Sequence, residues 1–457
     1  MKNNFFYPTI FCLAGPSFIL PSSALCSEKA EIKKDSKLPN ILVLLADDQG
    51  YADVSYHEHP AGISTPAIDQ LAKSGIVFTN GYASGYVSAP TRAGLLTGRY
   101  QQRYGFYTAS DSRQGLPVGE ILLPELLKKK GYTSGIFGKW HLGLEKPYYP
   151  TSRGFDNFYG FLGHGAHDYF DLTCSETPDD IHQCLYRNED KISDTGYLTD
   201  NLAREACGFI ENNAKSDSPF FLYLPFNAVH APLQAPEEDI RKFNSGNRDR
   251  DIQLAMIYRM DRAIGQVINK LKETGAYENT LIFYFNDNGG AKVSKAINTP
   301  LRDYKHSVYE GGIRVPFIIN WPGHLNHGTS DEPVISLDIL PTICAVLGID
   351  LPSDRVYDGR NIMPILQGKQ KNPLHESLFW DGNDGIWAIR EGKWKLIQNK
   401  EGNIELYNLI ADISEKTDLS KENPQIVEKL HNEFNEWRSQ MATPMGDLKQ
   451  KRNRNAK

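Results

Sequence analysis

Two pairs of oxygen-bearing side chains stand directly after apolar runs of this 457-residue sequence. Asp47 and Asp48 follow ILVLLA, and Asp287 and Asn288 follow LIFYFN. Adjacent carboxylates repel each other unless a cation lies between them, and purely oxygen donors suit a hard cation such as Ca²⁺ or Mg²⁺. Either pair alone equally suits the cap of a helix or turn. Two such pairs in one chain favour a metal site.

Cationic side chains follow other apolar runs. Lys139 and His141 lie in FGKWHLG, His230 lies in PFNAVHAP, and Lys305 lies in PLRDYKHS. Together with Arg92 and a metal ion, these side chains would form a pocket for a small, multiply charged oxyanion. One histidine at a strand end is more often structural than catalytic, so the prediction rests on the whole set.

The elements that must position these residues alternate between apolar, β-rich runs and helical patterns. Strands are predicted at 40–48, 133–138, 219–226, 279–287 and 316–323, and helices at 64–75, 123–132 and 256–275. Both sides of the strands are apolar, as expected for a central sheet that helices cover on both faces. Ligands of open α/β sheets bind at the carboxyl ends of strands, which is where the polar residues stand. The sequence therefore predicts an α/β sandwich.

The pattern changes toward the C-terminus. Alternating strands joined by Gly-containing turns are predicted at 386–409, followed by an amphipathic helix at 423–440. We therefore expect a catalytic domain at 38–368 and a smaller subdomain, an antiparallel sheet plus a helix, at 369–445. No repeat or low-complexity linker separates the two, so they are expected to share an interface.

Composition limits the class of protein. Hydrophobic residues make up 40% and aromatic residues 11% of the chain, enough for a sizeable core, which excludes a disordered or fibrous protein. The net charge of -6 is spread without long runs and gives no indication of nucleic-acid binding. The basic tail at 446–457 is interpreted as a solvated end.

The N-terminus has the layout of a secretory signal peptide at 1–26. It contains one lysine, a short apolar stretch interrupted by proline, and then small residues. Cleavage is expected after Ala24 or Cys26. A lipid anchor on Cys26 is disfavoured because Leu25 is bulky, and the alternative of a buried strand is weaker. The stretch is too short to make this an integral membrane protein.

Export would place the remaining cysteines in an oxidising compartment, periplasmic or extracellular. Cys174 and Cys184 are close enough in sequence to close a short disulfide loop, although the sequence leaves open whether they are bonded. Cys207 and Cys344 stand in apolar contexts and are predicted to be buried thiols.

The segment SAPTRAGLLTGR, residues 88–99, resembles the signature of the formylglycine-dependent sulfatases, in the form that has serine where many members have cysteine. Further blocks resemble those of the family in the same order, at 39–55, 131–143, 154–161, 197–206, 220–236, 282–290, 301–323 and 390–419. The similarity covers roughly residues 38–445. It implies an alkaline-phosphatase-like fold and the hydrolysis of sulfate esters.

In that family the Cys or Ser of this motif is oxidised after synthesis to an aldehyde, formylglycine (3-oxoalanine), and Ser88 matches it. The implied partner is a serine-type radical maturating enzyme that works without oxygen. One oxygen of the hydrated aldehyde attacks sulfur while the alcohol leaves. Removal of the proton from the second hydroxyl then expels sulfate, whereas an unmodified serine, having no second hydroxyl, would stay sulfated.

The resemblance also implies a metal shell. Asp47, Asp48, Asp287 and Asn288 match the ligands of one Ca²⁺ per chain, and modified Ser88 would complete the set.

Five further residues match positions with catalytic roles. Arg92 is similar to the residue that steadies the hydrated aldehyde, and Lys139 and Lys305 are similar to the lysines that bind sulfate. His141 matches the histidine beside the aldehyde, which is expected to be the base of the elimination. His230 matches the histidine on the leaving-group side, which would protonate the departing oxygen.

The substrate is indicated by class. His164, His167, Asp168 and Tyr169 form a polar and aromatic loop that suits a sugar ring at the pocket mouth, or equally a surface loop packed on the C-terminal subdomain. Because exported, serine-type members resemble bacterial enzymes that act on polysaccharides, we expect a sulfated carbohydrate rather than a simple aryl ester.

The segment around Lys305 departs from the family pattern. Relatives often have glycines where this chain has Asp303, Tyr304 and His306, so these side chains are expected to face the substrate.

Three alternatives stay open at this point. The chain would be a metal-dependent phosphoesterase if unmodified Ser88 attacked directly, but then Pro90 and Arg92 would have no special purpose, and no second-metal cluster is visible. It would be a non-catalytic binder of sulfated glycans if the aldehyde were never made. Ser88 would also be explained as an engineered replacement of cysteine.

Overall fold

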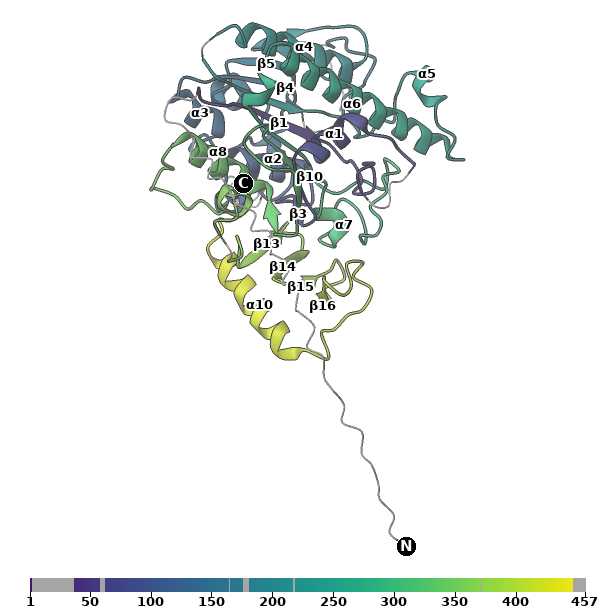
Figure 1. Ribbon diagram of the computed structural model, residues 1–457, viewed down its shortest axis with the longest axis vertical. Helices are drawn as coiled ribbons and strands as arrows, with labels where there is room; N and C mark the ends of the chain where they lie inside the picture. Colours follow the sequence, from purple (N-terminus) through teal and green to yellow (C-terminus); the bar gives the residue numbers. More distant parts are fainter. Residues whose placement is uncertain are drawn as a thin grey trace, which may run out of the picture. The chain divides into compact units, whose positions relative to one another are not determined.

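The computed structural model describes residues 1, 37–57, 62–163, 165–175, 181–216, 218–370 and 372–446 (Figure 1). The chain from Lys37 onward forms one compact unit. Apart from Met1, the predicted signal peptide lies outside the described residues, as do His164 and the basic tail beyond residue 446.

A ten-stranded mixed sheet, here called the main sheet, has the strand order β11-β2-β10-β9-β1-β8-β4-β5-β6-β7. Its strands are β1 (Asn40–Ala46), β2 (Ile76–Phe78), β4 (Thr133–Lys139), β5 (Asn157–Phe161), β6 (Leu185–Arg187), β7 (Asp190–Ile192), β8 (Phe220–Pro225), β9 (Thr280–Asn286), β10 (Phe317–Asn320) and β11 (Gly328–Ser330). The central strand β1 is parallel to both β8 and β9, whereas β10 is antiparallel to β9. The predicted large mixed sheet is confirmed.

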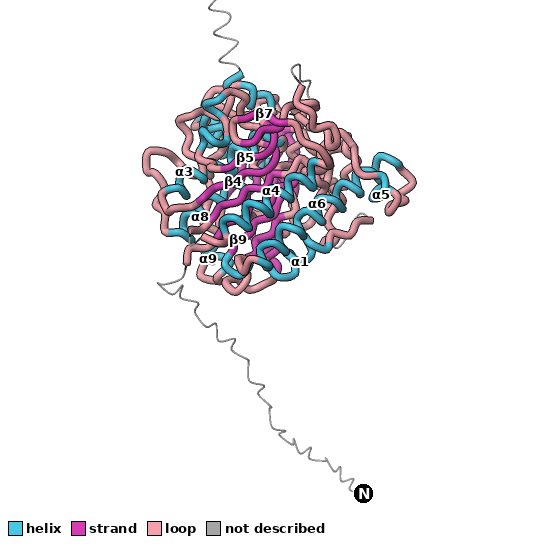
Figure 2. Tube along the Cα trace, turned by 90° about the horizontal axis from the view of Figure 1, so that it is seen from above, coloured by secondary structure: helices cyan, strands magenta, loops and turns pink. Residues whose placement is uncertain are grey.

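Helices cover both faces of the main sheet (Figures 1 and 2). The α-helices of the described chain are α1 (Pro66–Ser74), α2 (Ser88–Thr97), α3 (Leu123–Lys128), α4 (Leu198–Asn213), α5 (Glu237–Ile240), α6 (Arg248–Glu273), α7 (Glu310–Ile313), α8 (Ile339–Leu347), α9 (Met363–Leu366) and α10 (Pro424–Ser439), and of these α10 packs on the C-terminal sheet instead. Short 3-10 helices occupy Gln101–Tyr104, Ala109–Arg113, Lys146–Tyr148, Pro150–Arg153, Tyr277–Asn279 and Ser336–Asp338. No described helix combines the length and the apolar composition needed to cross a membrane.

Alternate side chains of β1 enter two separate cores, as the period of a strand requires. Leu42 and Leu44 pack in one core with residues of α1, α4 and α6. Ile41 and Val43 pack in the other with residues of α2, α3 and α8. This two-sided burial explains why the predicted strands read as continuous apolar runs.

A second, four-stranded sheet lies toward the C-terminus and is antiparallel throughout. Its strands are β13 (Ser377–Asp381), β14 (Trp387–Glu391), β15 (Trp394–Gln398) and β16 (Ile404–Asn408). Leu430, Phe434 and Trp437 of α10 share its core with Tyr82 and Tyr86 of the N-terminal part. The small antiparallel sheet with one helix is confirmed, and a pair of two-residue strands, β3 (Gly81–Tyr82) and β12 (Val334–Ile335), lies beside this core.

Helix α6 begins eight residues earlier than the apolar pattern indicates. Its first two turns carry charged residues that hide the period, and Asn247 caps the helix by accepting a hydrogen bond from the N–H of Arg250.

The states of the four described cysteines agree in part with the prediction. Cys174 and Cys184 are disulfide-bonded, Cys344 is buried, and Cys207 is only partly buried.

Candidate active site

The four predicted metal ligands meet at one edge of the main sheet. β1 and β9 end in register, with Ala46 opposite Asn286. The N–H of Asp287 donates to the carbonyl of Ala46 at 3.1 Å, and the N–H of Asp47 donates to that of Ala228 at 2.9 Å. The side chains that follow both strands are therefore brought together, and all four are buried.

Ser88 is the first residue of α2 and lies between the two pairs. Its Oγ is 3.3 Å from Oδ1 of Asp47 and 3.2 Å from Oδ1 of Asn288. The side chain is buried at the N-terminal end of a ten-residue helix, where the helix dipole favours negative charge. An oxygen on residue 88 is thus held beside both an anion-binding helix end and a set of oxygen ligands.

Arg92 lies one helical turn after Ser88 and is fully buried. Its Nη2 is 2.7 Å from Oδ2 of Asp287 and 3.2 Å from Oδ2 of Asp47, and its Nη1 donates to the carbonyl of Lys139 at 3.0 Å. The planar guanidinium therefore ties the ends of β1, β4 and β9 to α2, which a lysine could not do.

Two lysines contact the acidic pair after β1. Nζ of Lys139 is 2.5 Å from Oδ2 of Asp47, and Nζ of Lys305 is 2.7 Å from Oδ1 of Asp48. Burial alone would raise the pKa of Asp47, but Lys139, His230 and Arg92 more than offset this and lower it. Two cations on either side of the acids are placed to neutralise an oxyanion.

His141 and His230 differ in their surroundings. His141 has φ of 61°, and neither ring nitrogen has a hydrogen-bond partner among the described residues. Burial, with Lys139 and Arg92 adding to it, holds the pKa of His141 well below its usual range, so the ring is neutral. His230 Nδ1 lies 2.7 Å from the carbonyl of Ala231, which leaves Nε2 to face Asp48 at 3.6 Å.

The donor set fits a hard cation. Carboxylate oxygens of Asp47 and Asp48 lie within 4.8 Å of each other, with a ring nitrogen of His230 within the same distance. Oδ1 of Asp287 is buried without a hydrogen-bond partner in the described structure, and burial, followed by repulsion from Asp47, raises the pKa of Asp287 to about 6. A bound cation would satisfy this oxygen and stabilise its charge.

The loop predicted at the pocket mouth is tied down by its own hydrogen bonds. The ring nitrogens of His167 lie 2.6 Å and 2.9 Å from the carbonyls of Asp168 and Gln183. The hydroxyl of Tyr169 donates to the carbonyls of Asn227 and His230 at 2.8 Å and 2.9 Å. These contacts favour support of the His230 segment over direct sugar binding.

Asp168 also contacts protein groups. It accepts the N–H groups of Phe170 and Asp171 and the side-chain amide of Gln234. This is the arrangement of a loop that is held in place.

Asp303 and His306, by contrast, are exposed. Both have positive φ, 68° and 71°, a conformation uncommon for residues with a side chain. Asp48 and His141 share it, so four such residues gather around one site, as is frequent where function over-determines the backbone. The N–H of His306 donates to the carbonyl of Tyr86 at 3.1 Å.

Two residues of this site escaped the sequence analysis. Asn298 Oδ1 accepts the N–H groups of Tyr51 and Gly290, and its Nδ2 donates to the carbonyls of Gly290 and Asp303. One buried amide thus joins both metal-ligand loops to the Lys305 segment. Nothing in its local sequence, AINTP, indicated this, because its partner Tyr51 is 247 residues away.

The other is Asp384, in the turn between β13 and β14. Its Oδ1 accepts a hydrogen bond from the hydroxyl of Tyr86 at 2.8 Å. The run DGNDG at 381–385 signalled only a turn.

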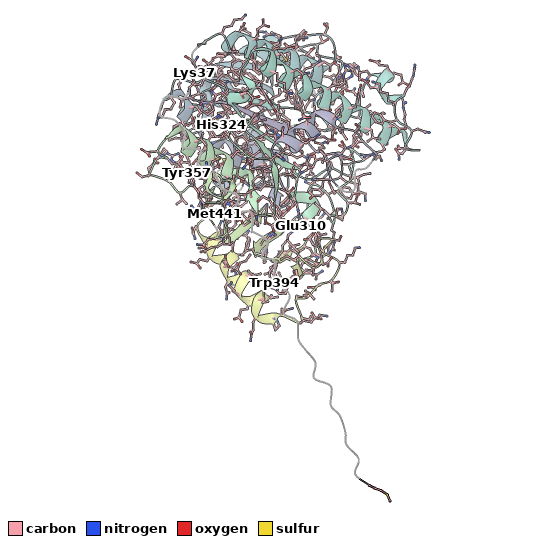
Figure 3. All side chains as sticks on the ribbon, in the orientation of Figure 1. Lys37, Glu310, His324, Tyr357, Trp394 and Met441 are labelled. Atoms are coloured by element: carbon pink, nitrogen blue, oxygen red, sulfur yellow. A yellow bond between two sulfur atoms is a disulfide. The ribbon has the colours of Figure 1, made fainter. Side chains whose placement is uncertain are left out.

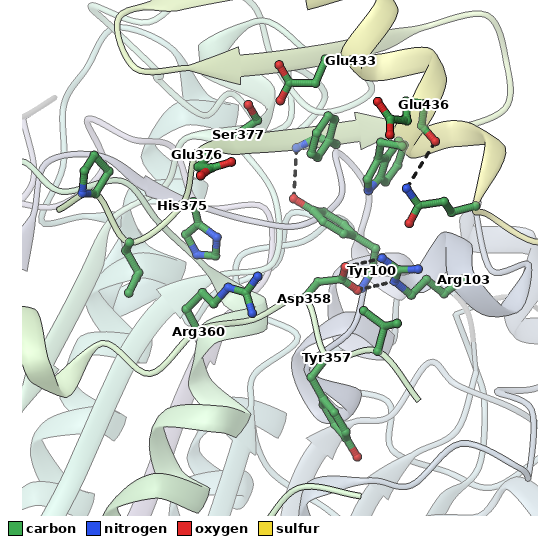
Figure 4. Close-up of a pocket in the computed structure, with 16 residues that line it drawn as sticks. Tyr100, Arg103, Tyr357, Asp358, Arg360, His375, Glu376, Ser377, Glu433 and Glu436 are labelled. Carbon is green, nitrogen blue, oxygen red and sulfur yellow. Dashed lines mark hydrogen bonds and ion pairs between the residues drawn. The ribbon is translucent and has the colours of Figure 1, made fainter. Parts of the chain in front are cut away.

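A cavity of about 550 Å³ lies elsewhere, between α10 and the segments near residues 358 and 376 (Figure 4). Tyr100, Arg360 and His375 line it together with acidic residues. None of the predicted catalytic residues lines it, so it is separate from the reaction centre.

Comparisons with known proteins agree on one family. A family model described as Sulfatase matches residues 39–349, and one described as N-sulphoglucosamine sulphohydrolase, C-terminal, matches residues 303–440. The first covers more than half of the chain.

Individual relatives match over most of their length. The uncharacterized sulfatase YdeN of Escherichia coli (strain K12) is 28% identical over 92% of this chain and 89% of its own. The N-acetylgalactosamine-6-sulfatase of Homo sapiens is 34% identical over 78% of this chain and 71% of its own. The solved structure of Ps i-CgsB in complex with k-i-k-neocarrahexaose is 37% identical, with a TM-score of 0.84 over 89% of this chain and 94% of that one.

Proposed function

The chain belongs to the sulfatase family and is a sulfuric ester hydrolase, and we propose that it removes sulfate from a carbohydrate with formylglycine made from Ser88. The observation that carries the proposal is the position of Ser88. Its Oγ lies within 3.3 Å of both Asp47 and Asn288, at the start of the helix that also carries Arg92. A nucleophilic oxygen at this point would meet the sulfate between two lysines.

The metal is proposed to be Ca²⁺. Asp47, Asp48, Asp287 and Asn288 would hold it, since they offer hard oxygen donors and one of those oxygens is buried without a partner. When bound, the ion would supply positive charge that makes the hydroxyl on residue 88 more acidic.

Each of the surrounding side chains would have its own role in the reaction. Lys139 and Lys305 would neutralise the oxygens of the sulfate group. His230, through Nε2, would give a proton to the alcohol oxygen as its bond to sulfur breaks. His141, neutral because it is buried, would accept the proton whose removal from residue 88 releases sulfate and restores the aldehyde.

A saccharide substrate is supported by the relatives. The human relative is named for N-acetylgalactosamine 6-sulfate, and the structure at 37% identity holds a neocarrahexaose. At the mouth of this site the exposed side chains are polar, as Asp303 and His306 are, which suits the hydroxyl groups of a sugar ring. A screen of sulfated saccharides would identify the sugar ring and the sulfated position.

Export and maturation belong to the same proposal. A disulfide joins Cys174 to Cys184, and disulfides persist mainly in oxidising compartments. We propose a periplasmic or secreted enzyme whose Ser88 is oxidised by a serine-type radical maturase.

The test is the mass of the tryptic peptide 74–92 from protein made with and without such a maturase. The expected result is a loss of two hydrogens at Ser88 only with the maturase, together with release of sulfate from sulfated oligosaccharides. Ser88→Ala, made in the same cells, is the inactive control. Unmodified Ser88 in protein that hydrolyses phosphate esters, but no sulfate ester, would overturn the proposal.

A further inference from the structure

We propose that Lys395, in the C-terminal sheet, is a positioning residue for the reaction: through Glu310 it holds the segment that carries Lys305 and supports Asn288. This inference rests on the proposed function for its catalytic consequence, but its structural half can be measured without activity.

Lys395 is at the centre of a buried ionic cluster. Its Nζ is 2.8 Å from Oε1 of Glu310 and 2.8 Å from Oε1 of Glu415, and all three side chains are fully buried. The other oxygen of Glu415 accepts the backbone N–H of Glu310 at 2.7 Å. Lys395 belongs to β15, whereas Glu310 begins α7, so the cluster joins the two parts of the chain at the place where Figure 3 labels Glu310.

The remaining oxygen of Glu310 is also occupied. Its Oε2 accepts the hydroxyl of Tyr82 at 2.7 Å and lies 3.2 Å from Nη1 of Arg314. Every polar atom of this side chain therefore has a partner, and its orientation is set by Lys395 of β15, Tyr82 of β3 and Arg314 of its own segment. Burial alone would raise the pKa of Glu310, but Lys395 and Arg314 lower it to about 2, so it stays ionised.

Helix α7 transmits this position to the reaction centre through its backbone. The carbonyl of Gly312 accepts the N–H of Gly289 at 2.9 Å, and Gly289 directly follows Asn288. A Cβ on Gly289 would lie 1.8 Å from the carbonyl oxygen of Gly311, so the two segments touch without space for a side chain. A shift of α7 must therefore move the end of β9.

The Lys305 segment is held by the same helix. The N–H of Gly311 donates to the carbonyl of Arg302 at 2.8 Å, and the N–H of Lys305 donates to the carbonyl of Gly290 at 3.1 Å. Lys305 thus lies in a loop whose two ends rest on α7 and on the metal-ligand turn. The position of α7 therefore limits where the backbone of Lys305 lies, from which Nζ reaches Asp48.

Stability alone is a poor reason for such a cluster. Replacing buried ion pairs with apolar residues of similar size is often neutral or stabilising, whereas removal of a single partner is costly. An ionic cluster does impose a direction on each side chain, which an apolar contact does not. This favours positioning as its purpose.

The experiment compares three proteins in the full chain: wild type, Lys395→Met with Glu415→Gln, and Lys393→Met as control. The double variant removes one cation and one anion together. Ionised Glu310 keeps Arg314 as its ionic partner, and an amide at position 415 can still accept the backbone N–H of Glu310. Lys393 is exposed and two residues away in sequence. Hydrogen–deuterium exchange is measured on peptides covering 287–290 and 302–312, with 133–139 as the internal reference.

The proposal predicts faster exchange in the first two peptides of the double variant, an unchanged reference peptide, and an unfolding temperature close to that of wild type. Misplacement by about an ångström costs up to about 100-fold in rate, so kcat should fall about 10- to 100-fold on saccharide and aryl sulfates alike, while Lys393→Met retains both properties. Unchanged exchange and unchanged kcat in the folded double variant would overturn it. Wild type without sulfatase activity would instead refute the proposed function, and the exchange data would still decide the positioning.

Discussion

Arg92 lies 2.7 Å from Oδ2 of Asp287, and both side chains are completely buried. This contact occupies one carboxylate oxygen and leaves Oδ1 without a partner in the described structure. The arginine therefore directs the free oxygen of Asp287 toward the proposed metal while it also contacts Asp47 and the end of β4.

Arg92→Lys should lose this arrangement, although it keeps the charge. A lysine cannot make the several divergent contacts of a guanidinium, so we expect sulfatase activity to fall about 100-fold or more and Ca²⁺ to bind more weakly. Calorimetric titration with Ca²⁺ and kcat/KM would be measured together. The control is Arg99→Lys, just after the C-terminal end of α2, where the arginine pairs with Glu120. It should leave the Ca²⁺ affinity and kcat/KM near those of wild type. Equal Ca²⁺ affinity in Arg92→Lys would refute the role.

Removal of the metal should destabilise the protein as well as inactivate it. Without a cation, the buried carboxylates after β1 and β9 repel one another. We expect a chelator to lower the unfolding temperature by about 5 °C or more, and added Ca²⁺ to restore it. In Asp287→Asn the repulsion is smaller and a ligand charge is lost, so the Ca²⁺-dependent shift should shrink. If a chelator left the unfolding temperatures of wild type and of Asp287→Asn unchanged, the result would contradict a metal at this site.

His230→Ala should separate two kinds of substrate. If Nε2 protonates the departing oxygen, the variant should lose about 100-fold or more on a saccharide sulfate, whose alcohol is a poor leaving group. An activated aryl sulfate leaves without such help, and its loss should be less than about 10-fold. The measurement is kcat for both substrates with matched aldehyde content at residue 88. Equal losses on the two would reject the acid role.

A pH-dependent effect on stability is expected far from the reaction centre, at Asp261 of α6. Its carboxylate accepts the N–H groups of Ala67 and Ile68 at the start of α1, and burial, opposed by those two hydrogen bonds, raises its pKa from 3.8 to about 6. The folded protein then holds a proton more tightly than the unfolded chain. Ionising Asp261 therefore costs stability as the pH rises from about 4 to about 6, up to about 3 kcal/mol.

Asp261→Asn removes this cost. The free energy of unfolding of the variant, relative to that of wild type, should therefore be higher at pH 7 than at pH 4. At pH 4 Asp261 is itself protonated in the folded wild type, so the substitution removes no charge there. Denaturant unfolding at the two pH values gives the comparison, with the exposed Asp249→Asn of the same helix as control. A constant difference across pH would contradict the prediction.

The sequence predicted that the polar residues after β1 and β9 lie together because strand ends are visible in it. Asp47 and Asp287 each end an apolar run, and a parallel sheet brings such ends together. The central strands were found for the same reason. The strands β2, β6, β7 and β11 have three residues each, too few to show a period, and they were not predicted.

The supporting residues could not be found in this way. Asn298, Lys395 and Asp384 act through partners that are distant in sequence, and their local patterns show a loop, a strand and a turn. The loop of His167 and Tyr169 shows the converse. Its composition suits sugar binding, but its side chains form hydrogen bonds to backbone carbonyls. Such contacts appear only once the chain has folded, so the local sequence did not indicate them.

Asp384 provides the last prediction, which concerns substrate recognition. Its carboxylate accepts the hydroxyl of Tyr86, two residues before Ser88, and Asp384 itself is exposed at the turn of the C-terminal sheet. It also interacts electrostatically with His306, against the charge of Lys305. The exposed carboxylate of Asp384 is linked through Tyr86 to the segment that carries Ser88, and we expect it to bind a hydroxyl of the sugar that carries the sulfate.

Asp384→Asn should therefore raise KM for a sulfated oligosaccharide about 3- to 10-fold, the difference expected between a charged and a neutral hydrogen-bond acceptor. The kcat for a small aryl sulfate, which does not reach this turn, should stay unchanged, because no group near the sulfur has been altered. Glu401→Gln, an exposed change in the turn between β15 and β16 of the same sheet, serves as control. If the aryl sulfate is affected as strongly as the saccharide, Asp384 acts through Tyr86 on the nucleophile and not on the sugar.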